Sequence, residues 1–158
     1  MSYKRILVPV DGSDTAARGM AEAIELAKDL RAKLLLLHVV DEYVVVSNPE
    51  LGTQAGPMLN AFRAQGQRTL DSIASTARAA GAQPETLLVE SLGMRVAERI
   101  IEEAVRREAD LIVMGTHGRR GVKRALLGSD AEMVARYSPV PVMLVPHAGR
   151  KFPPVDQD

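Results

Sequence analysis

The sequence predicts an open, doubly wound α/β fold, in which a five-stranded parallel sheet carries helices on both faces. The chain has 158 residues and is 46% hydrophobic, enough for one domain with a substantial core. Five short runs rich in apolar and β-branched residues are continuous rather than alternating, which is typical of strands buried on both faces of a parallel sheet. These runs cover residues 5–10, 33–40, 86–89, 111–114 and 140–145.

Stretches with helical spacing separate the five runs. Apolar residues recur every three or four positions over 20–30, after Asp14 as the expected N-cap, and again over 59–77, with Gly81 as the expected stop. A third helix is expected around 96–105, and a fourth from about Gly128 to Tyr137. Strands and helices alternate in this way only in α/β folds, whose ligand crevice lies at the carboxyl ends of the strands where strand order reverses.

Two segments fall outside this alternation. Residues 41–58 are long, rich in turn-forming residues and without clear periodicity, so they form either a mobile flap or a tolerated insertion. The last residues, 148–158, are expected to be a disordered tail. We therefore expect a single domain over 1–147 followed by this tail.

Charge and composition exclude several classes of function. Twenty Lys and Arg residues balance twenty Asp and Glu residues, so no overall field gathers nucleic acid, and the 3% aromatic content does not favour base stacking. The chain has no Cys, and no apolar run approaches the roughly 20 residues that cross a membrane. We expect a cytoplasmic protein with no nucleic-acid or membrane partner, in which any anion site is local.

Residues 115–129, GTHGRRGVKRALLGS, are the best candidate for such a site. Gly115 and Gly118 follow a predicted strand, and Gly128 and Ser129 precede a predicted helix, so backbone without side chains approaches from two sides. A helix N-terminus presents free N–H groups and a partial positive charge to a phosphate. We favour anion binding, although the glycines alone also fit simple turns and Ser129 a simple cap. Neither G-x-x-x-x-G-K-[ST] nor G-x-G-x-x-G is present.

These residues resemble a known pattern. Gly115-x-x-Gly118, nine residues, then Gly128-Ser129 is similar to the G-2x-G-9x-G-[ST] motif of the universal stress protein family. The segments ILVPVDGSD, LLLLHVVD, ADLIVMGTHGR and SPVPVMLVP also resemble that family's strands, in the same order along almost the whole chain.

The resemblance implies an adenine-nucleotide-hydrolase-like three-layer sandwich that binds ATP and has a regulatory role under stress rather than a known reaction. By position, Pro9 and Asp11 would lie beside the adenosine, Val39 would offer backbone hydrogen bonds to adenine, and Met114 would line the base pocket. Gly115, Gly118, Gly128 and Ser129 would surround the ribose and phosphates. Asp130 departs from the family, and its carboxylate would repel a triphosphate unless Mg²⁺ lies between them.

Catalysis finds less support in the sequence. Asp11, Ser13, Asp14 and His117 lie near strand ends that face the crevice, yet no G-x-S-x-G elbow surrounds Ser13. His38, inside a predicted strand, fits a hydrogen-bonded core residue, and it lies far along the chain from His117 and His147, so a zinc site is not expected. We favour a nucleotide-binding module over an ATPase and leave slow hydrolysis open.

Two further features concern partners. A basic cluster is either a phosphate clamp or a solvated loop, of which we favour the loop; it comprises Arg119, Arg120, Lys123 and Arg124. The last predicted strand, from Val140 to Val145, contains Pro141, which is confined to edge strands or strand starts. Exposed edges pair with other chains, so we expect a homodimer through this strand, as the resemblance also implies. A dimeric scaffold without nucleotide is the alternative.

Overall fold

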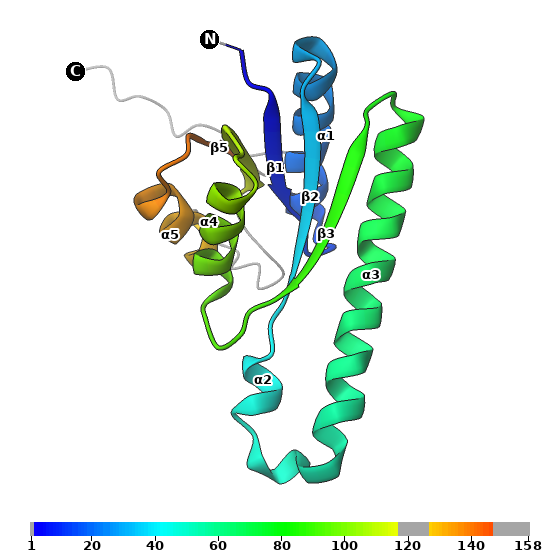
Figure 1. The fold of residues 1–158 in the computed structure, drawn as a ribbon, viewed down its shortest axis with the longest axis vertical. Coiled ribbons are helices and arrows are strands. Elements are labelled where there is room, and N and C mark those ends of the chain that lie inside the picture. The colour runs from blue at the N-terminus through cyan, green and yellow to red at the C-terminus, as the bar shows by residue number, and fades with distance from the viewer. Residues whose placement is uncertain (1, 117–126, 147–158) are drawn as a thin grey trace, which may run out of the picture.

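The computed structural model describes residues 2–116 and 127–146, and in them strands and helices alternate along the chain (Figure 1). Five strands pair in parallel in the order β3-β2-β1-β4-β5. The predicted five-stranded parallel α/β sheet is therefore confirmed. The strands are β1 Arg5–Pro9, β2 Lys33–Val40, β3 Pro84–Glu90, β4 Leu111–Gly115 and β5 Val142–Val145.

Helices cover both faces of this sheet. Helices α1 and α3 pack on one face, and helices α4 and α5 pack on the other. The helical elements are α1 Asp14–Leu30, α2 Tyr43–Val46, the 3₁₀ helix η1 Pro49–Gln54, α3 Ala55–Ala79, α4 Val96–Arg106 and α5 Ser129–Tyr137. No helix in the described ranges is long and apolar enough to cross a membrane.

Neighbouring residues of one strand belong to two different cores. Ile6 and Val8 of β1 pack with α1 and α3, whereas Leu7 between them packs with α4 and α5. In β2, Leu34 and Leu36 alternate in the same way with their neighbours. Side chains of a strand point alternately to opposite faces, so a sheet covered on both faces requires continuous apolar runs, which is the pattern that predicted it.

The helix ends agree with the sequence in two cases and differ in one. Gly81 follows α3 with a φ of 91°, and α5 begins at Ser129 directly after Gly128, both as predicted. The prediction of Asp14 as the N-cap of α1 is wrong, because Asp14 is already helical and Ser13 is the cap. The Ser13 hydroxyl accepts a hydrogen bond from the Ala16 amide at 3.2 Å.

Residues 41–58 contain more regular structure than the sequence indicated. They include α2, η1 and the first four residues of α3, which begins at Ala55 rather than near Leu59. Val45 is buried, and the Asn48 side chain accepts from the Glu50 amide at 3.1 Å, which starts η1. Packing of α2 on α3 thus overrides the low helix propensity of three successive valines.

The last strand is shorter than predicted but lies where it was expected. It begins at Val142 because Pro141 has no N–H to donate to the ladder, although the Pro141 carbonyl accepts from the Ile112 amide at 2.9 Å. It forms one edge of the sheet, as Pro141 indicated. The tail predicted over 148–158 lies outside the described residues.

Candidate functional site

The strand order reverses between β1 and β4, which is the position where open α/β sheets place their ligand crevice. From β1 the chain turns onto the face of α1, and from β4 it continues to α5 on the other face. Pro9 ends β1, and Met114 and Gly115 end β4. The structure therefore brings these three predicted residues to one edge.

Val39 belongs to this edge through its backbone. The Leu37 carbonyl accepts from the Val10 amide at 2.8 Å, so Leu37 directs its backbone groups toward β1. The Val40 carbonyl accepts from the Ser91 amide at 3.0 Å, so Val40 directs its groups toward the other side. Backbone groups alternate along a strand, and those of Val39 therefore point to the β1 side, two positions beyond the register partner of Pro9.

The turn after β1 is fixed by local hydrogen bonds. The Asp11 carboxylate accepts from the Ser13 amide at 2.9 Å, and Gly12 between them has a φ of 79°, a conformation that favours glycine. His38 is buried, and its Nδ1 lies 2.8 Å from the Val10 carbonyl, which confirms it as a hydrogen-bonded core residue. Asp11 is thus held half-buried directly after the end of β1.

The N-terminus of α5 lies against the end of β4. The Gly128 amide donates to the Thr116 carbonyl at 2.7 Å, and the Thr116 amide donates to the Val145 carbonyl at 3.1 Å. Gly128 is the N-cap and offers no side chain to the first-turn amides of α5, which remain directed out of the helix end. Ser129 and Asp130 are exposed in this turn. Four predicted residues, Gly115, Gly128, Ser129 and Asp130, therefore meet here.

Sequence reasoning missed one residue that sets how closely α1 packs against the end of β4. Gly19 lies inside α1, where an added Cβ would come 3.0 Å from the Gly115 nitrogen and 3.2 Å from the Met114 carbonyl carbon. Only a residue without a side chain lets α1 approach the end of β4 so closely. A glycine in the middle of an amphipathic helix was the available signal.

The sequence also showed no sign of a charged cluster at the ends of β2 and β3. Arg63 of α3 forms an ion pair with Glu90, which ends β3, and donates to the Asn60 side chain at 2.9 Å. The Arg63 guanidinium lowers the pKa of Glu90, whereas the hydrogen bond with Glu90, followed by burial, raises the pKa of Glu42. The cluster ties α3 to the sheet, and no local pattern relates residues so distant in sequence.

Several predicted residues lie outside the described ranges. These are Gly118, His117, His147 and the basic cluster of Arg119, Arg120, Lys123 and Arg124. Of the catalytic candidates, Ser13 uses its hydroxyl to cap α1. Asp14 stands in the first turn of the same helix.

The fold is that of an open α/β protein with its topological switch point between β1 and β4. The family model of the universal stress protein family matches residues 2–146. A universal stress protein, MJ0531, from Methanocaldococcus jannaschii is 36% identical over 143 residues, covering 90% of this chain and 82% of that protein. The chain therefore belongs to the universal stress protein family.

Solved structures agree with this assignment. The hypothetical protein MJ0577 matches with a TM-score of 0.82 at 27% identity, covering 95% of this chain and 100% of that one. A universal stress protein in complex with cAMP matches with a TM-score of 0.64 at 28% identity, covering 92% and 98% of the two chains. The protein from Archaeoglobus fulgidus in complex with dAMP matches with a TM-score of 0.63 at 25% identity, covering 91% and 98%.

Proposed function

We propose that this chain binds an adenine nucleotide, ATP with Mg²⁺, between the ends of β1 and β4, and that it acts as a homodimeric regulatory protein of the stress response. The observation that carries the proposal is the meeting of the β1 turn, the β2 backbone and the α5 N-terminus at one edge of the sheet. Two structural neighbours were solved with the adenine nucleotides cAMP and dAMP, which supports the choice of ligand.

The adenosine end of the site uses backbone more than side chains. The Val39 amide and carbonyl, directed to the β1 side, supply the donor and acceptor that an adenine edge requires. Pro9 and Met114 offer apolar contact to the base, and the Asp11 carboxylate accepts from a ribose hydroxyl. Such a site is selective for adenine because backbone hydrogen bonds demand a fixed donor and acceptor pattern.

The phosphates belong at the N-terminus of α5. Its amides and its dipole favour negative charge, and Gly115 and Gly128 leave room for the phosphate oxygens. The Ser129 hydroxyl adds a donor. Asp130 and Glu132 in the same turn oppose an anion, and a carboxylate is an oxygen ligand that Mg²⁺ accepts. We therefore expect ATP to bind as its Mg²⁺ complex, and the resemblance adds Gly118 of the motif as an expected phosphate-binding residue.

Calorimetric titration of ATP with Mg²⁺ tests the proposal. Micromolar binding is expected, with loss in Gly118→Val, whose side chain would occupy the phosphate approach. Gly56→Ala is the control, because Gly56 lies in α3 with no atom within 4 Å of an added Cβ. No binding by the unaltered chain would contradict the proposal and favour a dimeric scaffold without nucleotide.

Measuring the turnover of ATP distinguishes an ATPase from a protein that only binds the nucleotide. We expect bound ATP to be released unchanged or cleaved slowly, because the Ser13 hydroxyl is engaged as the cap of α1. Steady multiple turnover that disappears in Asp11→Ala would show an ATPase instead.

The homodimer is expected to pair the β5 strands of two copies. β5 is an edge strand, and its Met143 is 39% exposed. Met143→Glu would place two carboxylates face to face in such a pair and should weaken dimerisation. Light scattering that finds a monomer for the unaltered chain at micromolar concentration would remove this part of the proposal.

A further inference from the structure

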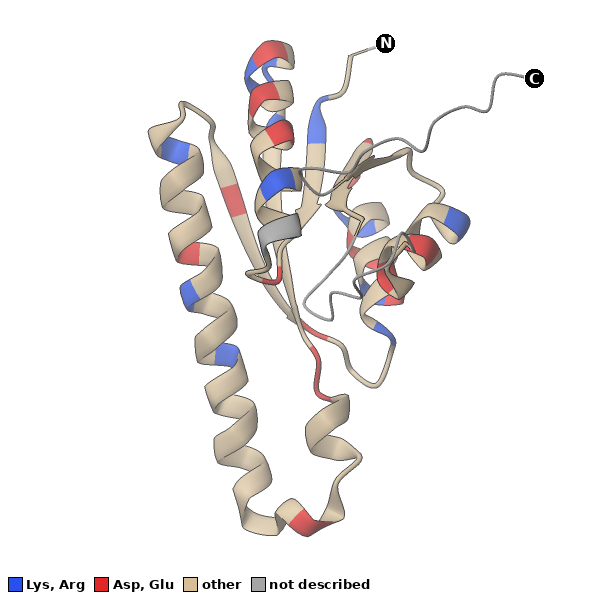
Figure 2. Ribbon diagram, turned by 180° about the vertical axis from the view of Figure 1, so that it is seen from behind, with Lys and Arg blue, Asp and Glu red and all other residues tan. Residues whose placement is uncertain are grey.

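The sheet differs in charge between the two edges at which its strands begin and end. Strands β1 and β2 each begin with a cation, Arg5 and Lys33, and α4 ends at Arg106 beside them. Acidic residues lie at the carboxyl edge, where Asp41 follows β2 and Glu90 ends β3. Figure 2 shows this contrast, with the start of β1 in blue and red segments where β2 and β3 end. The amino edge thus gathers cations that the proposed nucleotide site does not use.

The strand residues at this edge point to one face of the sheet. Arg5, Lys33 and Glu85 each come two positions before a leucine of the core under α4 and α5, and side chains two positions apart in a strand share a face. These leucines are Leu7, Leu35 and Leu87. Helix α4 packs on the same face and ends at Arg106, which Arg107 follows. Four cations from three segments distant along the chain therefore meet here.

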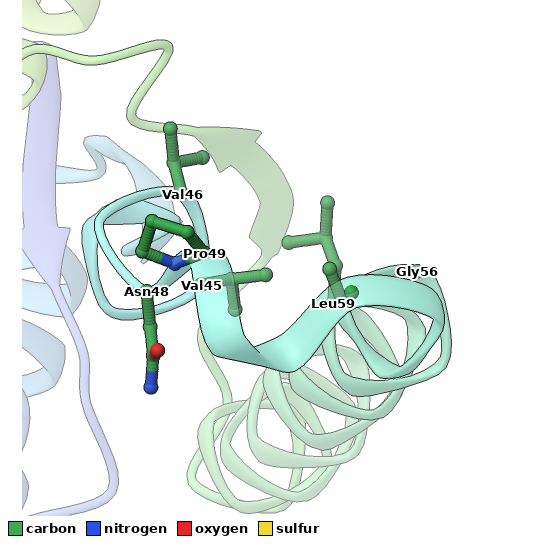
Figure 3. A pocket seen from close by; sticks show the side chains of 8 residues that line it. Val45, Val46, Asn48, Pro49, Gly56 and Leu59 are labelled. Carbon is green, nitrogen blue, oxygen red and sulfur yellow. The ribbon is translucent and has the colours of Figure 1, made fainter.

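A pocket of about 240 Å³ lies among these side chains. Its lining consists of the four cations, Glu85 and Leu35, of which Leu35 is only 3% exposed. A larger hollow of about 380 Å³, between α2, η1 and the start of α3, has no charged residue in its lining (Figure 3). Pockets for drug-sized ligands span about 300 to 1,000 Å³. The smaller, basic pocket therefore suits a small anion, or one charged group of a larger molecule.

Contacts behind the pocket hold three of its cations in place. Glu103 is fully buried, and its oxygens lie 3.2 Å from Nη1 of Arg106 and 3.4 Å from Nε of Arg107. The same carboxylate pairs with Arg99 at 3.2 Å, so three guanidinium groups share it. The Nη1 group of Arg5 donates to the Arg107 carbonyl at 3.1 Å. Groups held in this way lose less conformational entropy when an anion binds.

The carboxylates around the pocket do not neutralise its cations. Within the described ranges the four cations form ion pairs only with Glu85, Glu103 and Glu108, and Lys33 forms none. Glu85 Oε1 lies 3.9 Å from Nη1 of Arg107, which is too far for a hydrogen bond. The carboxyl end of α4 adds a partial negative charge of about one half. A positive excess and unused guanidinium N–H donors therefore remain for a ligand.

We propose that this pocket binds an anion through a phosphate group. Guanidinium groups match phosphate oxygens with paired N–H donors, and an ammonium group adds a compact charge. The pocket supplies three guanidinium groups and one ammonium group. It lies at the opposite edge of the sheet from the proposed nucleotide site, so it stands whether or not ATP binds there (Figure 1). The phosphate group belongs either to the free inorganic ion or to a phosphorylated small molecule.

NMR of backbone amides tests the proposal during titration with inorganic phosphate, at an ionic strength held constant with chloride. Saturable changes are expected at Lys33 and Arg107. A second titration uses glucose 6-phosphate: tighter binding than inorganic phosphate at these amides identifies a phosphorylated molecule as the ligand class, and weaker binding identifies the free ion. Changes at Ser129 alone would place the phosphate at the nucleotide site, and this result, or no change with either anion, would overturn the proposal.

Substitutions in the pocket test whether its charges hold the anion. Lys33→Gln breaks no ion pair among the described residues and should weaken phosphate binding about three- to fivefold, the range of an exposed ion pair. Glu85→Gln should strengthen binding by a similar factor, because it removes the carboxylate from the pocket wall. Arg68→Gln is the matched control, since Arg68 is exposed on α3, which packs on the other face of the sheet. Equal affinities of the unaltered chain, Lys33→Gln and Arg68→Gln would indicate an adventitious ion only and overturn the proposal.

Discussion

Gly66→Ala should destabilise the protein and displace the turn after β1, beside the proposed adenosine site. Gly66 lies in α3, where an added Cβ would come 2.5 Å from Cδ2 and 2.9 Å from Nε2 of His38, and 2.9 Å from Cδ1 of Leu88. The His38 ring cannot retreat freely, because its Nδ1 is bonded to the Val10 carbonyl at 2.8 Å. Val10 directly precedes Asp11, so a shift of the ring is transmitted to the turn beside the proposed adenosine.

The size of the effect follows from three contributions. Forcing an extra methyl into a packed core costs about 1 to 3 kcal/mol. Loss of the bond between His38 and Val10 adds about 1 kcal/mol, and the better helix propensity of alanine returns up to about 1 kcal/mol. The net free energy of unfolding should therefore fall by about 2 kcal/mol, which equals the middle of the packing cost.

Urea unfolding followed by circular dichroism measures this difference. Gly56→Ala in the same helix is the control, because nothing lies within 4 Å of its added Cβ, and it should be neutral or stabilising by up to about 1 kcal/mol. If both substitutions change the free energy of unfolding in the same direction, the result would contradict the close packing of Gly66 against His38.

Two other predictions concern charge and capping. The pKa of Glu42 is raised from 4.5, chiefly by its hydrogen bond with Glu90, so the folded chain favours the neutral carboxyl of Glu42. The neutral carboxyl therefore stabilises the folded state at low pH, and this contribution to the free energy of unfolding is lost as pH rises through the raised pKa. Glu42→Gln should therefore be more stable than the unaltered chain at pH 7 but not at pH 4, and thermal melts giving the same difference at both pH values would contradict this. Ser13→Ala should lower the free energy of unfolding by about 1 kcal/mol through loss of the α1 cap, and Ser13→Asp should retain most of it. Urea titration of both variants checks the cap, and equal losses would argue against it.

The strands were predictable because their burial on both faces leaves a local pattern. β2 is apolar at nearly every position, and each of its residues from Leu34 to Leu37 enters one of the two cores. The meeting of the carboxyl ends of β1 and β4, where the nucleotide site is proposed, followed from topology, since these ends lie side by side where the strand order reverses.

What the sequence did not predict depends on contacts distant along the chain. The valines of α2 favour a strand locally and become helical only through packing on α3. Arg63 and Glu90 are 27 positions apart in the sequence. Gly19 and Gly115 are close in space although most of the domain separates them along the chain. Local patterns carry no information on which of these partners will meet. Ser13 and Asp14 are adjacent, and both residue types favour the N-cap position, so the sequence alone did not decide between them.

The central claim is that an adenine nucleotide binds where β1, β2 and β4 end beside α5. NMR of backbone amides during titration with ATP and Mg²⁺ tests it most directly, because each amide reports its own position. The largest changes are expected at Val39, Gly115 and Ser129, with little change at Val105 on the far side of α4. Changes confined to other parts of the chain, or none at saturating nucleotide, would contradict the account.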